Sequence, residues 1–232
     1  MLTINPTDLA PPANTADHAT ALCFAPCSQA LGLYAVLPTA EWVGRMARAG
    51  VPTVQLRFKS TDPQAIAQEV HAAVQAVQGT NSRLFVNDYW RLAIEAGAYG
   101  AHLGQEDLDT LTEQDVTTLR QSGLRLGIST HTDAELVRAA ALRPSYIALG
   151  AVFPTTLKAM PTAPLGLERL AGYAQLLQAY STVAIGGIGA EHLRDIAATG
   201  VGSFAVVRAI VAAPNPEAAA HDLMAQWSAA KK

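Results

Sequence analysis

The segment ARAGVPTVQL, residues 47–56, shows how a helix is followed by a strand in this sequence. Gly50 ends a helical stretch, as glycine commonly does just after a helix C-terminus, and an apolar run follows it. The same order recurs in EAGAYGAHL, residues 95–103, and in ATGVGSFAV, residues 198–206. This repeated transition predicts a parallel α/β fold rather than an antiparallel one.

Strand-like runs occur about eight times along the sequence and alternate with amphipathic helical stretches. The runs are residues 31–38, 51–58, 83–88, 100–104, 124–130, 145–153, 182–188 and 203–210, and helical patterns include residues 61–78, 89–97, 132–143 and 192–200. This is the pattern of a (β/α)8 TIM barrel, and a length of 232 residues fits one such domain. A doubly wound open sheet is the structural alternative.

The N-terminal residues 1–30 differ from the rest of the sequence. They are rich in Pro, Asn, Thr and Ala and have no sustained period, which indicates an irregular extension. We therefore expect an extension over residues 1–30 and a single barrel domain over residues 31–232.

The composition favours a compact globular enzyme, because 50% of the residues are hydrophobic and 15% are charged. A balance of 16 basic and 19 acidic residues, with a net charge of -3, gives no general attraction to nucleic acid or to an anionic membrane. Cys23 and Cys27 have no second pair to complete a zinc site. Without a basic signal region or a long apolar run, we expect a cytoplasmic protein, and the sequence leaves its oligomeric state open.

Polar residues cluster where strands are expected to end, which is the functional end of a barrel. In VPTVQLRFK, residues 51–59, the two-residue period of a strand puts Gln55, Arg57 and Lys59 on one face. Arg57 and Lys59 could converge there on a phosphate or diphosphate, although solvated charges at a strand end are the simpler alternative. Lys158, in the polar loop PTTLK, adds a third cation and favours the anion site.

Two carboxylates follow consecutive strands. Asp88 and Asp107 could hold one Mg²⁺, which commonly takes one or two protein carboxylates together with water and substrate phosphates. The alternative is that each carboxylate caps the helix that follows it.

Other polar and glycine positions are weaker signals. The IGGIG turn, residues 185–189, would let backbone amides approach a second phosphate. His102 and His131 lie near the expected rim, but with no visible partner we interpret them as structural histidines.

These motifs together resemble the thiamine-phosphate synthase family over nearly everything after the extension. The matching stretches are QLRFK, VNDYWRLAIEAGAYGAHLGQEDL, LGIST, YIALGAVFPTTLK, VAIGGI and AVVRAI, in that order. The resemblance implies an enzyme that joins an aminomethylpyrimidine diphosphate to a hydroxyethylthiazole phosphate, releasing pyrophosphate and forming thiamine phosphate.

The resemblance also implies roles for individual residues. The pyrimidine diphosphate site would comprise Gln55, Arg57, Lys59, Asn87, Ser129 and Lys158, of which Arg57, Lys59, Ser129 and Lys158 would be catalytic. Asp88 and Asp107 would bind Mg²⁺. The thiazole phosphate would be held by Thr155, Gly187, Val207 and Arg208.

Two positions depart from the family pattern. Leu157 replaces a hydroxyl donor for the thiazole phosphate, and Arg208 replaces a serine near the last strand. Because arginine can bind phosphate bidentately, the second change could offset the first. The alternatives are a thiazole tautomerase of the same barrel, a sugar-phosphate isomerase and a barrel that binds such phosphates without turnover.

Overall fold

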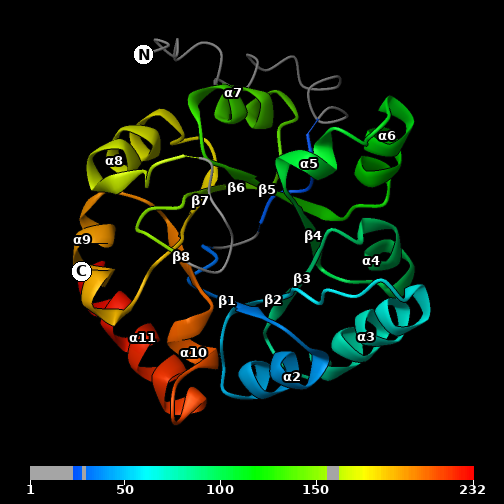
Figure 1. The fold of residues 1–232 in the computed structure, drawn as a ribbon, viewed down its shortest axis with the longest axis horizontal. Coiled ribbons are helices and arrows are strands. Elements are labelled where there is room, and N and C mark those ends of the chain that lie inside the picture. The colour runs from blue at the N-terminus through cyan, green and yellow to red at the C-terminus, as the bar shows by residue number, and fades with distance from the viewer. Residues whose placement is uncertain (1–22, 28–29, 156–161) are drawn as a thin grey trace.

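A computed structural model describes residues 23–27, 30–155 and 162–232. Eight parallel strands close into a barrel in sequence order, with β1 pairing with both β2 and β8 (Figure 1). The strands are β1 (Leu33–Leu37), β2 (Thr53–Leu56), β3 (Arg83–Asn87), β4 (Gly100–Leu103), β5 (Arg125–Thr130), β6 (Tyr146–Leu149), β7 (Ser181–Ile185) and β8 (Ser203–Val206). The closure confirms the predicted (β/α)8 barrel and excludes the doubly wound open sheet, in which edge strands stay unpaired.

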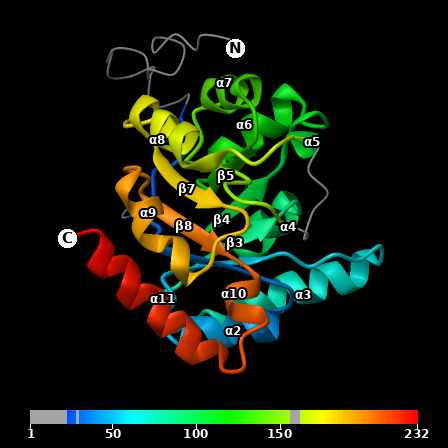
Figure 2. The same cartoon turned by 60° about the vertical axis from the view of Figure 1, so that its left-hand side comes forward.

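The helices form a ring outside the strands (Figure 1). They are α2 (Ala40–Arg48), α3 (Pro63–Ala76), α4 (Trp90–Ala96), α5 (Gln105–Leu108), α6 (Glu113–Gln121), α7 (Asp133–Ala141), α8 (Gly166–Leu176), the 3₁₀ turn η2 (Ala190–His192), α9 (Leu193–Ala198), α10 (Arg208–Val211) and α11 (Pro216–Ala230). The C-terminal helix α11 packs against α9, α10, α2 and β1, and so covers the junction where the barrel closes (Figure 2). Within the described residues, no helix combines the length and apolar character needed to cross a membrane.

Local sequence signals set the helix boundaries. Asp62 accepts a hydrogen bond from the Gln64 N–H, and Pro63 occupies the first turn of α3, where its missing N–H has no cost. At the other end of a helix, Gly97 has a φ of 73° and stops α4, as the Gly-to-strand punctuation predicted.

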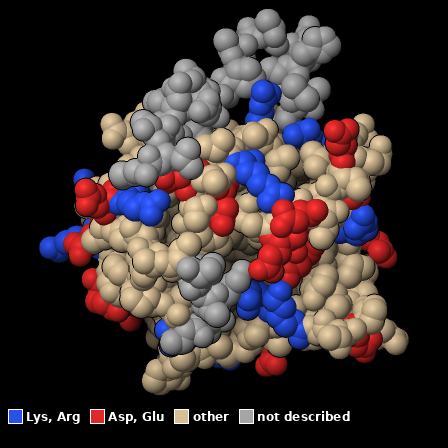
Figure 3. All heavy atoms as spheres, turned by 45° about the horizontal axis from the view of Figure 1, so that its top comes forward, with Lys and Arg blue, Asp and Glu red and all other residues tan. Residues whose placement is uncertain are grey.

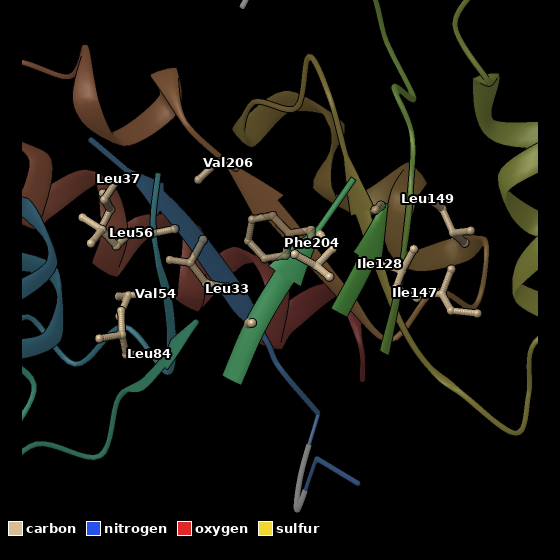
Figure 4. Packing of buried hydrophobic residues seen from close by; sticks show 14 of the residues in the cluster. Leu33, Leu37, Val54, Leu56, Leu84, Ile128, Ile147, Leu149, Phe204 and Val206 are labelled. Carbon is tan, nitrogen blue, oxygen red and sulfur yellow. The ribbon is translucent and has the colours of Figure 1, made fainter. Parts of the chain in front are cut away.

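The strands bury both faces. Side chains that point outward, among them Val54, Leu56, Ile147 and Phe204, pack between the barrel and its helices (Figure 4). The other face fills the barrel with a second cluster that includes Tyr34, Phe85 and Tyr146. Alternation along the strands therefore separates an outer layer from an interior layer, in which polar residues occupy the end that carries the site.

Several strands end earlier than their apolar runs predicted. The strand expected over residues 51–59 is wrong at its end, because β2 stops at Leu56. Leu56 pairs with Leu37, the last residue of β1, and after one more bond, from the Arg57 N–H to the Leu37 carbonyl oxygen at 2.8 Å, β1 offers no further partner. The run 203–210 likewise contains the end of β8 at Val206 and the start of α10 at Arg208.

Candidate functional site

The predicted site residues lie at the C-terminal ends of the strands. Gln55 and Asn87 are buried, with 4% and 8% of their surfaces exposed, near the ends of β2 and β3. Arg57 and Lys59 follow β2, and Ser129 is the penultimate residue of β5. These five positions therefore come from three strands that open at one end of the barrel.

Lys59, in the loop after β2, and Asp88, in the loop after β3, form an ion pair. The Lys59 Nζ atom lies 2.5 Å from Asp88 Oδ2, and 55% of the lysine side chain and 22% of the aspartate side chain are exposed. The pair gives a partner to Lys59, one of the two cations that follow β2. It also places a carboxylate and an ammonium together at the C-terminal ends of two neighbouring strands.

Asp88 has an unusual backbone conformation. Its φ of 65° lies in the left-handed region, which non-glycine residues visit rarely and Asp and Asn tolerate best. Its N–H donates to the carbonyl oxygen of His102, which fixes this turn against β4. Since Tyr89 is the N-cap residue of α4 and no side chain caps that helix, the alternative that Asp88 serves as a helix cap is wrong.

Asp107 was expected at the end of a strand. It lies instead in the short helix α5, which begins just after β4 ends. Its Oδ2 atom accepts a hydrogen bond of 2.7 Å from the Gly104 N–H, so Asp107 does cap a helix, but the helix is α5, which contains it, and not a helix that follows it. The capping hydrogen bond leaves the carboxylate facing the site. Burial, and then the charge and hydrogen bond of Asp88, raise the pKa of Asp107 above its usual range.

The two aspartates form a donor set of hard oxygen atoms, and the charge of Asp88 disfavours ionisation of Asp107, which raises the pKa of Asp107. This combination fits Mg²⁺, which needs only one or two protein carboxylates when water and phosphate complete its octahedron. The described residues include no group of three or more His, Cys, Asp or Glu that could hold a metal ion. On the face drawn in Figure 3, clusters of basic and of acidic side chains lie next to one another, and neither sign covers the coloured surface broadly.

The glycine-rich turn lies against the loop that follows β6. Gly186 and Gly187 have φ values of 100° and 67°, and a Cβ atom added to Gly187 would lie 2.6 Å from the carbonyl oxygen of Pro154. Thr155 follows Pro154 directly and is partly buried. Thus the turn after β7 and the predicted phosphate contact after β6 are adjacent, whereas Leu157 and Lys158 lie outside the described residues.

The last strand leads directly into a short helix. Val207 is the N-cap residue of α10 and packs against the barrel interior, and Arg208 is the first residue of that helix. The loops after strands 7 and 8, together with the start of a short extra helix, are a frequent phosphate-binding place in TIM barrels. Gly187, Val207 and Arg208 lie on these elements.

His102 is a residue whose importance the sequence did not reveal. Burial lowers its pKa to about 4, and both of its ring nitrogens are hydrogen-bonded: Nδ1 to the Tyr146 hydroxyl and Nε2 to the Ser129 hydroxyl, each at 2.7 Å. The expectation of a satisfied histidine is therefore confirmed, yet one partner is a predicted substrate contact. His131 instead pairs with Glu135 at 2.9 Å.

A closed parallel barrel with polar groups at the C-terminal ends of its strands is the architecture of the TIM-barrel enzymes. Residues 33–210 match the model of a family described as thiamine monophosphate synthase. The thiamine-phosphate synthase of Neisseria meningitidis serogroup B is 52% identical over 206 residues, covering 89% of this chain and 99% of that protein. That of Photorhabdus laumondii is 52% identical over 192 residues, covering 83% and 88%.

A similar solved structure supports the same family. Thiamine phosphate pyrophosphorylase from Pyrococcus furiosus has a TM-score of 0.74 at 25% identity, covering 87% of this chain and 98% of that one. The chain therefore belongs to the thiamine monophosphate synthase family.

Proposed function

We propose that the protein is an enzyme of thiamine biosynthesis that condenses 4-amino-2-methyl-5-(diphosphooxymethyl)pyrimidine with 4-methyl-5-(2-phosphooxyethyl)thiazole. The products are thiamine phosphate and pyrophosphate. The observation that carries the proposal is the contact between Lys59 and Asp88 beside Asp107, because a reaction that releases pyrophosphate needs cations and metal-binding carboxylates at one place. The names of its relatives support the same activity.

The pyrimidine diphosphate would bind over β2, β3 and β5. Gln55 donates one amide hydrogen to Tyr34 at 3.0 Å, which holds the side chain inside the barrel and leaves its carbonyl oxygen for the pyrimidine ring. Asn87 and Ser129 would add hydrogen bonds to the same substrate. Arg57 and Lys59 would bind the diphosphate, joined by Lys158 from the loop after β6.

The thiazole phosphate would bind over β6, β7 and β8. The backbone of Gly187 and of Val207 would approach the phosphate, and Thr155 would donate to it. Arg208 would provide the positive charge that replaces the hydroxyl lost at Leu157.

Asp88 and Asp107 would hold Mg²⁺ when the diphosphate is present. When bound, the ion supplies positive charge to the leaving pyrophosphate. This role requires both carboxylates to be ionised. The raised pKa of Asp107 means that proton loss and metal binding would support each other.

The reaction would proceed by departure of the diphosphate before attack. The bond between the pyrimidine methylene carbon and the diphosphate oxygen breaks, and its electron pair leaves with pyrophosphate, whose charge Arg57, Lys59 and Lys158 stabilise. The aminopyrimidine ring, held by Gln55 and Ser129, carries the positive charge. The thiazole nitrogen then forms the new bond with its own lone pair, so no general base is needed and positioning and electrostatics provide the catalysis.

The test is a reaction of purified protein with both substrates, with Mg²⁺ or with excess chelator, in which thiamine phosphate and pyrophosphate are measured together. Equal amounts of both products, formed only with Mg²⁺, are expected. Binding of the thiazole phosphate without either product would favour the tautomerase relative or the non-catalytic barrel. We further infer that the enzyme acts in the cytoplasm on these small molecules, without nucleic acid or membrane as a partner.

A further inference from the structure

The barrel interior contains a row of five side chains joined by hydrogen bonds, here called the interior network. It runs from Gln55 Nε2 to Tyr34 Oη at 3.0 Å, then to Tyr146 Oη, to His102 Nδ1 and, from His102 Nε2, to Ser129 Oγ, each of these three at 2.7 Å. Its two ends are residues of the proposed pyrimidine site. Its three middle members lie inside the barrel, with 2%, 0% and 6% of Tyr34, Tyr146 and His102 exposed.

The interior network has one consistent direction of donation. An amide nitrogen only donates, so Tyr34 accepts from Gln55. Among the described residues, Tyr146 is the hydrogen-bond partner that can accept the Tyr34 hydroxyl proton, so we assign this donation from Tyr34 to Tyr146. Tyr146 then donates to His102 Nδ1, which has to be unprotonated in order to accept. The ring proton is left on Nε2, where it is donated to Ser129 Oγ.

This direction decides what Ser129 can offer a ligand. Its oxygen already accepts a hydrogen bond from His102, and its hydroxyl proton has no other acceptor among the residues that the structure describes. A hydroxyl held in this way donates to an acceptor atom of the substrate. The amide of Gln55 is likewise oriented by its bond to Tyr34.

A glycine, Gly127, leaves the space that the Tyr146 ring of the interior network occupies. A Cβ atom added to Gly127 would lie 2.0 Å from Cζ of Tyr146 and 2.4 Å from its hydroxyl oxygen. Gly127 on β5 pairs in register with Tyr146 on β6, so the ring crosses directly over the glycine. The His102 and Tyr146 rings are stacked, with centroids 5.7 Å apart and planes 20° apart. The position of the Tyr146 hydroxyl is therefore set by close packing.

We propose that Tyr34, Tyr146 and His102 are positioning residues that fix the direction of this network, so that Ser129 binds the pyrimidine substrate as a hydrogen-bond donor. The inference rests on the proposed function, because it assigns a substrate to Ser129. None of the three positioning residues needs to touch the substrate. They act through the orientation of the Ser129 hydroxyl.

The first test measures the histidine tautomer in the full-length protein. ¹⁵N shifts of the six histidines, with His102 assigned by comparison with His102→Gln, should show a neutral ring with its proton on Nε2. Tyr146→Phe removes the donor to Nδ1 and should change this signal. A proton found on Nδ1 in the wild-type protein would overturn the proposal, whether or not the protein is active.

The second test is a kinetic double-mutant cycle. Tyr146→Phe should raise the KM for the pyrimidine diphosphate about 5- to 10-fold, the range of one hydrogen bond, and leave the KM for the thiazole phosphate within about 2-fold. In a Ser129→Ala background, Tyr146→Phe should have almost no further effect, because the hydroxyl that it orients is gone. Independent effects of the two substitutions would overturn the proposal.

Tyr99→Phe is the matched control, because Tyr99 packs edge-on against Phe85 in the same interior and lies outside the network. It should leave the KM for the pyrimidine diphosphate unchanged, and an effect equal to that of Tyr146→Phe would also overturn the proposal. A wild-type protein that forms no thiamine phosphate would refute the proposed function instead, while the tautomer measurement would still test the interior network.

Discussion

The Lys59 ammonium contacts the Asp88 carboxylate, with 2.5 Å between Nζ and Oδ2, at the point where two consecutive strands of the barrel end. The two residues are 29 positions apart in the sequence and come together because β2 and β3 are neighbours. The lysine thereby neutralises one of the two carboxylates proposed to bind Mg²⁺. Binding of the diphosphate would give the lysine a second anion and release Asp88 toward the metal.

The first prediction concerns this competition. Lys59→Met removes the charge and keeps most of the stem, so the substrate-free protein should bind Mn²⁺, used as a probe for Mg²⁺, about 2- to 5-fold more tightly, the range expected for one exposed ion pair. Turnover should fall at the same time, because the diphosphate loses a cation. Electron paramagnetic resonance of Mn²⁺ and steady-state kinetics give the two readouts. Lys59→Arg, which keeps the charge, should not tighten Mn²⁺ binding, and weaker binding to Lys59→Met would contradict the competition.

The second prediction separates the charge of Asp88 from its backbone. Asp88→Asn removes the charge but suits the φ of 65°, so its melting temperature should stay within about 2 °C of the wild type. Turnover should fall roughly 100-fold or more, as expected for loss of an electrostatic group in a preorganised site. Asp109→Asn, in an exposed carboxylate paired with Arg138, is the control and should retain full activity. Near-normal turnover of Asp88→Asn at saturating Mg²⁺ would argue against the metal site.

The third prediction tests the glycine turn after β7. Gly187→Ala adds a Cβ atom 2.6 Å from the Pro154 carbonyl oxygen, so the two loops must separate, and the KM for the thiazole phosphate should rise about 10-fold or more. Gly200→Ala is a matched control, because its φ of 86° imposes similar backbone strain while no atom lies within 4 Å of the added Cβ. Gly200→Ala should lower stability by about 1 kcal/mol and leave both KM values unchanged. Equal KM effects of the two variants would show that strain, not loop contact, is responsible.

The fourth prediction concerns Arg208, the first residue of α10. If its guanidinium replaces the hydroxyl absent at Leu157, Arg208→Ala should raise the KM for the thiazole phosphate about 10-fold and make it less dependent on salt. The KM for the pyrimidine diphosphate should not change. Arg194→Ala, in an exposed arginine of α9, is the control. Unchanged affinity of Arg208→Ala for the thiazole phosphate would remove the proposed compensation.

The sequence predicted the features that depend on local order. Periodicity and glycine punctuation predict the barrel, and the position of polar residues after apolar runs predicts that Gln55, Asn87 and Ser129 lie at one end of it. Contacts between distant segments leave no local pattern in the sequence. The Tyr34 and Tyr146 hydroxyls are 112 positions apart, so the interior network could be identified only from the closed barrel. The left-handed backbone conformation of Asp88 could not be predicted from the sequence either, because aspartate is common in turns of many kinds.

The fifth prediction concerns the contact between α7 and α8, on which the pH dependence of stability can be tested away from the site. The Tyr173 hydroxyl and Arg169 both donate to Asp133, and the tyrosine bond and then the arginine lower the pKa of that carboxyl below its usual 3.8. A group whose pKa is lowered by folding stabilises the protein above its unfolded pKa, and this contribution is lost as the pH falls through the folded value.

Tyr173→Phe should therefore lower the melting temperature by about 2–4 °C at pH 7, the range for about 1 kcal/mol in a chain of this size. Thermal unfolding followed by circular dichroism should show this difference shrinking as the pH is lowered below about 4, where the aspartate of the unfolded chain becomes protonated before the folded one does. A difference that stays constant down to pH values near 2.5 would mean that lost packing, and not the charged hydrogen bond, accounts for the destabilisation.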